Sequence, residues 1–183
     1  QVMALLLNGL GESARSREDF TLAAELYRKA LGYNRQAGDR VRQTTNLINL
    51  GVTALSQNDF DKAAEFYKEG LEISSGMADM NGSIYCLEGL AATYWTNKDP
   101  ERAAVLFGAA SAARSANNLL LEPADRVPHD RSIERLRGLL AGERFDLLFT
   151  EGTQLGVEAA AALAFGQSIR TLSILKNRLI LDT

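Results

Sequence analysis

The chain has 183 residues, of which 46% are hydrophobic and 23% are charged, and its formal net charge is −3 at pH 7. Its single Cys and single His exclude a Cys/His zinc site and an intrachain disulfide. The low net charge gives no general attraction to nucleic acid or anionic lipid. The apolar run from Val2 to Leu7 is too short to cross a bilayer. We therefore predict a cytoplasmic protein that contacts no membrane, binds no nucleic acid directly, and uses no metal or cofactor. Because it begins at Gln1 rather than at a Met, we expect it to be part of a larger parent protein.

The first 121 residues contain one pattern three times at a spacing of 40 residues. Leu-Gly or Leu-Ala pairs open the three copies at Leu10, Leu50 and Leu90. Each of these leucines has another leucine three residues before it, and such i, i+3, i+4, i+7 spacing places the apolar residues on one face of a helix. The small residue after each leucine predicts that two backbones approach closely there. Three copies in register predict an array of equivalent units, in which Leu10, Leu50 and Leu90 occupy equivalent environments.

A second helix follows within each copy. Its face alternates small and large residues, at Ala23, Tyr27 and Ala30 in the first copy and at matching positions in the other two. An aspartate separates the two halves at Asp19, Asp59 and Asp99, which is where a helix N-cap is expected. Each copy is therefore predicted to form a hairpin of two antiparallel helices.

These hairpins resemble the tetratricopeptide repeat, whose pattern W-x₂-L-G-x₂-Y…A-x₃-F…P reads here as Leu7-x₂-Leu10-Gly11-x₂-Ala14…Ala23-x₃-Tyr27. The Trp is replaced by Leu, the closing Pro is missing, and the repeat is longer than the usual 34 residues. The long repeat is similar to that of bacterial signalling ATPases and of maltose-regulator-type transcription activators. The resemblance implies an all-α, right-handed superhelical solenoid, with three hairpins over residues 1–121 and capping helices over residues 122–183.

The tail does not continue the repeat. Residues 122–128 contain two of the three prolines and are predicted to be a connector. Helices are expected from about His129 to Ala141, from Glu143 to Glu151, and after Gly152 through Phe165. The last segment, Ile169 to Leu181, is amphipathic, and either caps the solenoid or docks on another chain.

No catalytic motif is present, so we predict that the chain is not an enzyme. The sequence lacks both G-x-x-x-x-G-K-[ST] and G-x-G-x-x-G. Cys86 and His129 are 43 residues apart, and Cys86 adjoins Leu87 on a repeat helix, where a buried structural role is expected.

The candidate site lies on the first helix of each hairpin, where repeat proteins present a concave face. Its apolar middle and polar, aromatic flanks suit a helix or an extended peptide. Trp95 is the expected anchor, because aromatic residues dominate interface energetics. An alternative is that the apolar residues of the second copy only pack against neighbouring repeats. The candidates are Asn8, Glu12 and Arg15 in the first copy, Ile48, Asn49, Val52 and Leu55 in the second, and Tyr85, Glu88, Ala92 and Trp95 in the third.

We predict a non-catalytic protein–protein interaction or sensor module of a bacterial signalling or transcription regulator. Its partner would be a protein or peptide segment, including one from another domain of the same parent chain. Few residues suit the carboxylate clamp that some repeat proteins use for chaperone tails, so that specialisation is rejected. Two alternatives stay open. One is a small-molecule effector site built on Tyr85, Tyr94 and Trp95, and the other is self-assembly into a homodimer through the C-terminal helix.

Overall fold

The computed structural model describes residues 1–96, 99–121 and 123–167, and all the regular structure within them is α-helical. This confirms the prediction of an all-α fold. The helices, in chain order, are α1 (Val2–Ser16), α2 (Phe20–Gln36), α3 (Arg40–Ser56), α4 (Phe60–Ser75), α5 (Met80–Thr96), α6 (Pro100–Ala116), α7 (Pro123–Leu139), α8 (Gly142–Thr153) and α9 (Val157–Ala164).

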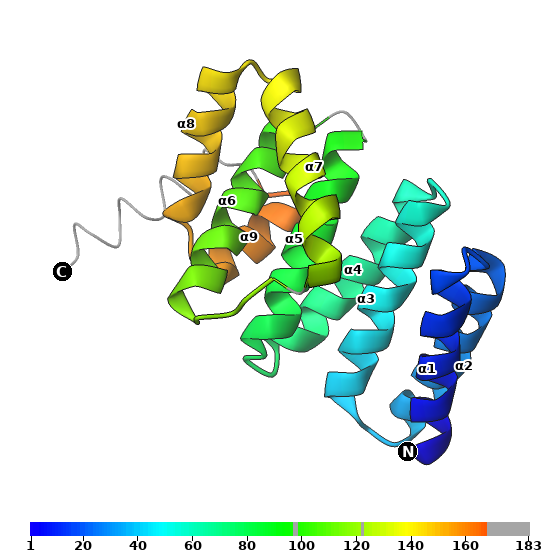
Figure 1. Cartoon of the computed structure of the whole chain (residues 1–183). Helices are drawn as coiled ribbons and strands as arrows, with labels where there is room; N and C mark the ends of the chain where they lie inside the picture. Colours follow the sequence, from blue (N-terminus) through cyan, green and yellow to red (C-terminus); the bar gives the residue numbers. More distant parts are fainter. Residues whose placement is uncertain (97–98, 122, 168–183) are drawn as a thin grey trace.

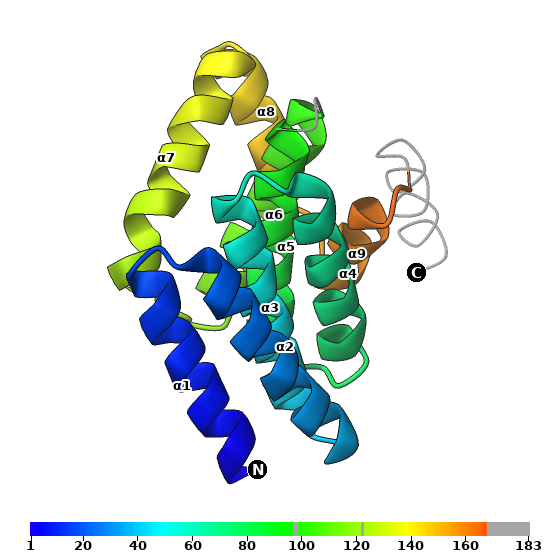
Figure 2. The same cartoon turned by 90° about the vertical axis from the view of Figure 1, so that its right-hand side faces the viewer.

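The first six helices form three antiparallel hairpins that stack side by side, as expected for a tetratricopeptide-like solenoid (Figure 1). Each helix packs on the next one in the chain, both within a hairpin and between hairpins. The six helices are 15 to 17 residues long. Helices α7 and α9 lie on opposite sides of this array (Figure 2), with α9 beside α4, α5 and α6.

The turns repeat as regularly as the helices. Asp19, Asp39 and Asp59 precede α2, α3 and α4, and the side chain of each accepts a hydrogen bond from a backbone N–H three residues later. The residue just before each of them, at 18, 38 and 58, has a positive φ of 59° to 67°. This left-handed residue reverses the chain and places the aspartate at the helix N-cap, where its oxygen satisfies a free N–H group.

Tyrosine rings fill the space beside the glycines that follow the first two opening leucines. A Cβ added to Gly11 would lie 2.6 Å from the ring of Tyr27, and one added to Gly51 would lie 2.6 Å from the ring of Tyr67. The Tyr67 ring also lies against Gly89, on the next hairpin. The predicted reason for these small residues therefore needs correction, because a buried ring, and not a second backbone, occupies the space.

The tail differs from its prediction at one point. The predicted connector over residues 122–128 is wrong, because α7 is already helical from Pro123 and continues through Pro128. Pro123 is the first residue of this helix, where a proline is tolerated because the first N–H groups of a helix have no intrahelical partner. Helices α8 and α9 fall where the sequence places them. The predicted amphipathic segment Ile169 to Leu181 lies outside the described residues.

Two glycines bring α8 into direct contact with α6. A Cβ on Gly108 would lie 2.1 Å from the backbone oxygen of Phe149, and a Cβ on Gly152 would lie 2.0 Å from that of Val105. Behind them, the hydroxyl of Tyr94 donates a hydrogen bond to the carbonyl of Ala164 in α9 (2.6 Å). The tail thus covers the last hairpin, as a solenoid end requires.

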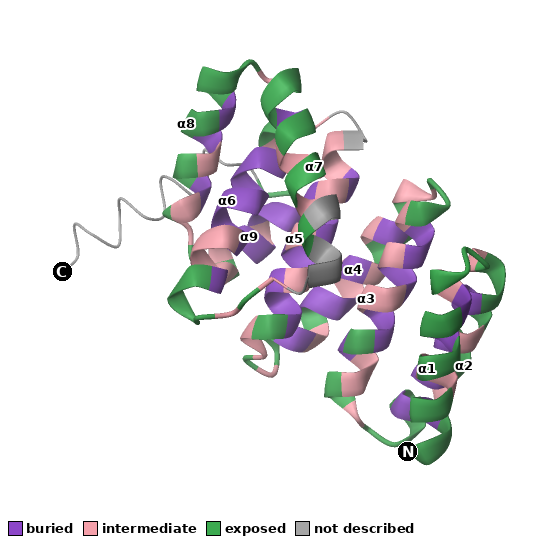
Figure 3. Ribbon diagram, in the orientation of Figure 1, coloured by how far each residue is buried: buried purple, intermediate pink, exposed green. Residues whose placement is uncertain are grey.

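The three opening leucines do not share one environment, contrary to the prediction. Leu50 and Leu90 are buried at 1% and 0% exposure, whereas Leu10 is 56% exposed. The contrast is visible in Figure 3, where the helices in the middle of the array are largely buried and α1 is largely exposed. Leu50 and Leu90 lie against a preceding hairpin, and no described helix precedes α1.

Candidate functional site

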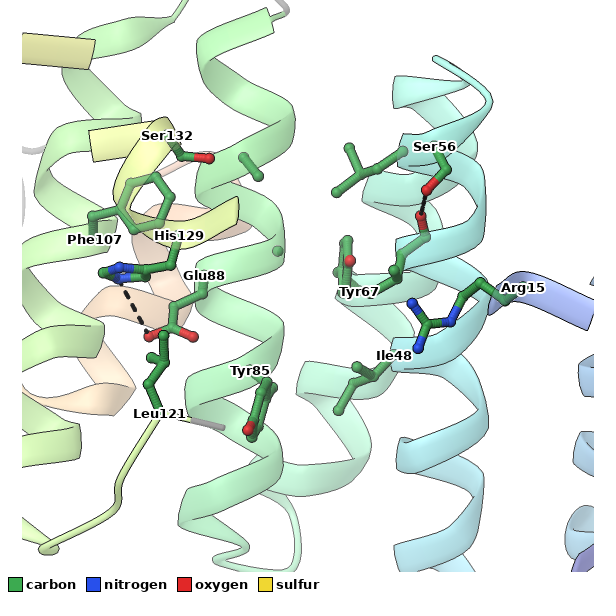
Figure 4. Close-up of a pocket in the computed structure, with 14 residues that line it drawn as sticks. Arg15, Ile48, Ser56, Tyr67, Tyr85, Glu88, Phe107, Leu121, His129 and Ser132 are labelled. Carbon is green, nitrogen blue, oxygen red and sulfur yellow. Dashed lines mark hydrogen bonds and ion pairs between the residues drawn. The ribbon is translucent and has the colours of Figure 1, made fainter. Parts of the chain in front are cut away.

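A groove runs along the face of the array formed by α1, α3 and α5, and α7 closes one end of it. It consists of two adjoining hollows with volumes of about 440 and 670 Å³. Four residues line both hollows, which makes them one continuous site: Arg15, Ile48, Val52 and Tyr85. We call this site the concave groove, and Figure 4 shows the end near α7.

The end near α7 is mainly apolar. Ile48, Val52 and Leu55 lie one helical turn apart on α3 and form one wall, and Ala92 lies opposite on α5. Phe107 and Leu121 close this end together with α7. The α3 residues are half-buried and pack partly on the core, so the same positions serve stability and leave an apolar surface open.

A charged network lies at the base of this apolar end. Arg114 of α6 donates to both carboxylate oxygens of Glu88, from Nη2 at 2.7 Å and from Nε at 3.2 Å. Both side chains are nearly buried, with 9% and 13% exposure. The ring of His129 packs edge-on against Phe107, and its Nε2 lies 4.0 Å from Glu88. Arg114 thus neutralises the Glu88 carboxylate within the protein, and the pair joins α5 to α6.

Arg15 differs from the other charged residues of the concave groove. It extends from α1 to the wall formed by α3 (Figure 4), and its Nε is buried without a hydrogen-bond partner. No ion pair joins it to a carboxylate anywhere in the described part of the chain. Burial raises the pKa of the neighbouring Tyr27, and hydrogen-bonding and charge interactions with the Arg15 guanidinium oppose that rise. A partly buried guanidinium that no carboxylate neutralises is suited to binding one.

The other end of the groove is polar, and its charges have partners within the chain. Glu12 accepts a hydrogen bond from the amide of Asn8 (2.8 Å), and Asp79 caps α5 by accepting from the backbone N–H of Gly82 (3.1 Å). The remaining side chains here are mostly hydroxyls and amides, from Thr44, Thr45, Asn49 and Asn81.

Asn8 joins α1 to α3 beneath this polar end. Its carbonyl oxygen accepts from the amides of Asn46 (2.8 Å) and Asn49 (3.1 Å). Asn46 in turn accepts from the buried amide of Asn34 (2.7 Å), which extends the chain of hydrogen bonds to α2. This network fixes the distance between the first two hairpins, and therefore the width of the groove.

The structure brings together most of the residues that the sequence marked as candidates. Two of them do not reach the wall of the concave groove. Asn8 lies beneath it, and Trp95 packs on the core with the guanidinium of Arg135 5.7 Å from its ring centroid. The candidates that line the groove are Glu12, Arg15, Ile48, Asn49, Val52, Leu55, Tyr85, Glu88 and Ala92.

Sequence reasoning missed the part of the groove formed by the second helices and by the tail. Phe107 is the third-copy counterpart of Tyr27, which was expected to pack between helices, and Leu121 is the last residue of the predicted repeats. His129 and Ser132 belong to the segment expected to cap the solenoid. Only the direction in which α7 crosses the array brings these residues to the groove, and no periodicity in the sequence specifies that direction.

Other chemistry finds no support in the described residues. Burial raises the pKa of the Cys86 thiol well above its usual range, so it stays protonated and packs as a small apolar group beside Gly70. No group of three or more His, Cys, Asp or Glu side chains in the described part of the chain is placed to hold a metal ion. No helix among these residues combines the length and apolar character needed to span a bilayer.

The fold and the groove define a class: a helical-repeat solenoid with an open concave face. Within that class, residues 2–75 match the family model of the tetratricopeptide repeat. The match spans α1 to α4 and supports a tetratricopeptide-repeat domain, a type of domain that generally mediates protein–protein interactions and is typically non-catalytic. No curated protein matches the chain.

Proposed function

We propose that this chain is a partner-binding module whose concave groove holds a segment of another protein, or of another domain of its parent. The observation that carries the proposal is an apolar wall beside the Arg15 guanidinium, which forms no ion pair with a carboxylate among the described residues, both within one continuous hollow. Apolar grooves that are lined by a few polar groups suit short peptide segments, because the apolar surface supplies affinity and the polar groups fix the register.

The chemistry of the groove suggests what the segment carries. Apolar side chains would cover Ile48, Val52 and Leu55, and an Asp or Glu side chain would pair with Arg15. Glu88 is not proposed as a direct contact, because Arg114 already neutralises it. The bound segment is therefore proposed to carry apolar side chains and an acidic residue beside them.

Asn8 and Trp95 keep a role in this proposal, although they lie behind the wall. Asn8 holds α1 at a fixed distance from α3, and Trp95 supports α7 through Arg135. Both would act on affinity by positioning the elements that line the groove.

The parent is proposed to be a bacterial signalling or transcription regulator, because the long repeat resembles those proteins. In such a parent, a segment that prefers one arrangement of the hairpins biases the activity of the whole protein by its difference in affinity.

A small-molecule effector is the second candidate, and the size of the hollows favours it, since pockets of a few hundred cubic ångströms hold such ligands. However, the three aromatic residues that would stack on it are dispersed. Tyr85 lines the groove, Tyr94 bonds to α9 and Trp95 lies under α7. The third candidate, self-assembly through residues 169–181, falls outside the described residues. Light scattering of the full chain and of a chain that ends at Phe165 tests it.

Selection from a random peptide library displayed on phage tests the groove directly. The immobilised full chain should enrich apolar peptides that contain Asp or Glu, and the same selection on Val52→Lys should enrich none of them. Arg15→Gln should still enrich apolar peptides while losing the preference for an acidic residue.

The control is Leu22→Lys, a substitution at an exposed apolar residue of α2 outside the concave groove, which should select the same peptides as the native chain. Synthetic copies of the enriched peptides should bind Val52→Lys at least about tenfold more weakly, which corresponds to about 1.4 kcal/mol. If no peptide is enriched, or if Val52→Lys and Leu22→Lys behave alike, the groove is not the binding site.

A further inference from the structure

Helix α1 carries an apolar face that nothing in the described structure covers. Four large side chains of this face, Val2, Met3, Leu6 and Leu10, are between 51% and 71% exposed. The adjoining side of the same helix is buried through Ala4, Gly11 and Ala14, and α1 packs on α2. We call these four residues the α1 outer face, and in Figure 3 they lie on the largely exposed helix at the N-terminal end of the array.

The 40-residue repeat identifies what covers the same face on the other two hairpins. Leu10 corresponds to Leu50 and Leu90, and Leu6 corresponds to Asn46 and Cys86. These four counterparts are at most 2% exposed. Leu50 belongs to the same core cluster as Leu31 of α2, and Leu90 to the same cluster as Leu71 of α4. In both cases, the second helix of the preceding hairpin packs on this face and buries it.

We propose that the α1 outer face is a stacking interface for the second helix of one further hairpin of this 40-residue type. The interface would continue the two that the chain already contains, between α2 and α3 and between α4 and α5. A second copy of the described structure has no such helix available, because α2 is covered by α3, α4 by α5, and α6 by α8 and α9.

The α1 outer face also defines the chemistry of the helix that covers it. Each internal interface contains a buried side-chain hydrogen bond, from Asn34 to Asn46 in one and from Ser83 to Ser74 in the other. The α1 outer face offers only hydrocarbon and thioether at the matching positions, so a polar residue opposite it would lose its hydrogen bond on burial. The covering helix therefore carries an apolar residue where α2 has Asn34 and α4 has Ser74.

Two extended chains test this proposal. In the first, a copy of residues 41–80 that carries Ser74→Ala precedes Gln1, which keeps the repeat in register. In the second, an unaltered copy of residues 1–40 precedes Gln1, so that its Asn34 faces Leu6. Thermal unfolding of both is compared with that of the native chain, with and without Leu10→Ala at the original position.

Leu10→Ala should lower the Tm of the native chain by less than about 1 °C and that of the first extended chain by about 6 °C or more. The reason is that truncating a buried leucine loses apolar contacts and leaves a cavity, whereas truncating an exposed one does not. The first extended chain should also unfold at a higher temperature than the second. If Leu10→Ala has the same small effect in all three chains, or if neither extension raises the Tm, the face does not stack and the proposal is wrong. If the native chain sediments as a dimer that Leu6→Lys separates, a second copy is the occupant, and the proposal is wrong in that way instead.

Discussion

Helix α6 and helix α1 stand at opposite ends of the three hairpins, and their surroundings differ. All eight residues from Ala103 to Ala110 of α6 are buried, beneath α5, α8 and α9. Helix α1 buries three residues and leaves Leu6 and Leu10 in solvent. Helix α1 is the first helix of its hairpin and α6 is the second helix of the last one. The comparison shows that neighbouring elements decide how much of a repeat helix is buried.

The largest expected effect concerns the closed end. Gly108→Ala places a Cβ against a backbone oxygen of α8, which cannot move as a side chain can, so α8 must separate from α6. We expect a loss of about 4 kcal/mol in the free energy of unfolding, above the usual range for overpacking. Urea denaturation measures it. The matched control, Gly138→Ala in α7, has no neighbour within 4 Å and should be neutral or slightly stabilising. Equal effects at the two sites would contradict the close packing of α6 on α8.

The next effect compares the two ends at equivalent positions. Leu50→Ala removes a buried side chain and should cost about 3 kcal/mol, whereas Leu10→Ala should cost less than about 0.5 kcal/mol. Urea denaturation of both variants measures this difference. A large loss for Leu10→Ala in the native chain would mean that the α1 outer face is already covered in solution.

A third, smaller effect tests the rings that support the array. Gly51→Ala should cost about 2 kcal/mol, because the Tyr67 ring is confined between Gly51 and Gly89 and cannot retreat from the new methyl group. Gly9→Ala, on the exposed side of α1 with no neighbour within 4 Å, should instead gain up to about 0.8 kcal/mol from helix propensity. Thermal and urea unfolding distinguish the two signs, and a loss at Gly9 would show that this side of α1 is occupied.

The smallest expected effect is the loss of stability when the charge of an N-cap aspartate is removed. It should be similar along the array, because these aspartates recur at every turn of the first hairpins. The pKa of Asp39 is lowered, first by the backbone N–H of Arg42 and then by the Arg42 side chain. Its contribution is therefore present above the ordinary carboxyl pKa and is lost as the pH falls through the lowered value. Asp39→Asn keeps the cap but removes the charge, so it should cost about 0.5 kcal/mol at pH 7 and almost nothing at pH 2. Asp59→Asn should show the same direction, and a loss that grows in acid would contradict this account.

Much of the array follows from the sequence because its determinants are local. Aspartate caps and the helical spacing of apolar residues recur every 40 residues, and each depends on contacts within a few turns. For the same reason, the α1, α3 and α5 side of the concave groove could be predicted, and Arg15, Ile48, Val52 and Tyr85 all line it.

Residues that depend on distant contacts could not be placed in the same way. Trp95 is the type of residue that anchors interfaces, yet α7 crosses above it and the guanidinium of Arg135 lies over its ring. The connector predicted before α7 is helical, and His129 reaches Glu88 and Phe107 at one end of the groove. Each of these outcomes depends on how α7 crosses the array, which local patterns do not encode.

The sequence by itself determined that this protein is a series of paired helices, since periodicity, caps and small residues act over short separations. Only the tertiary structure decided which apolar faces lie in the core, which guanidinium has no carboxylate partner in the described part of the chain, and which end of the array stays open. The physical reason is that burial and pairing are properties of two surfaces in contact, and each copy of a repeat specifies only one of them.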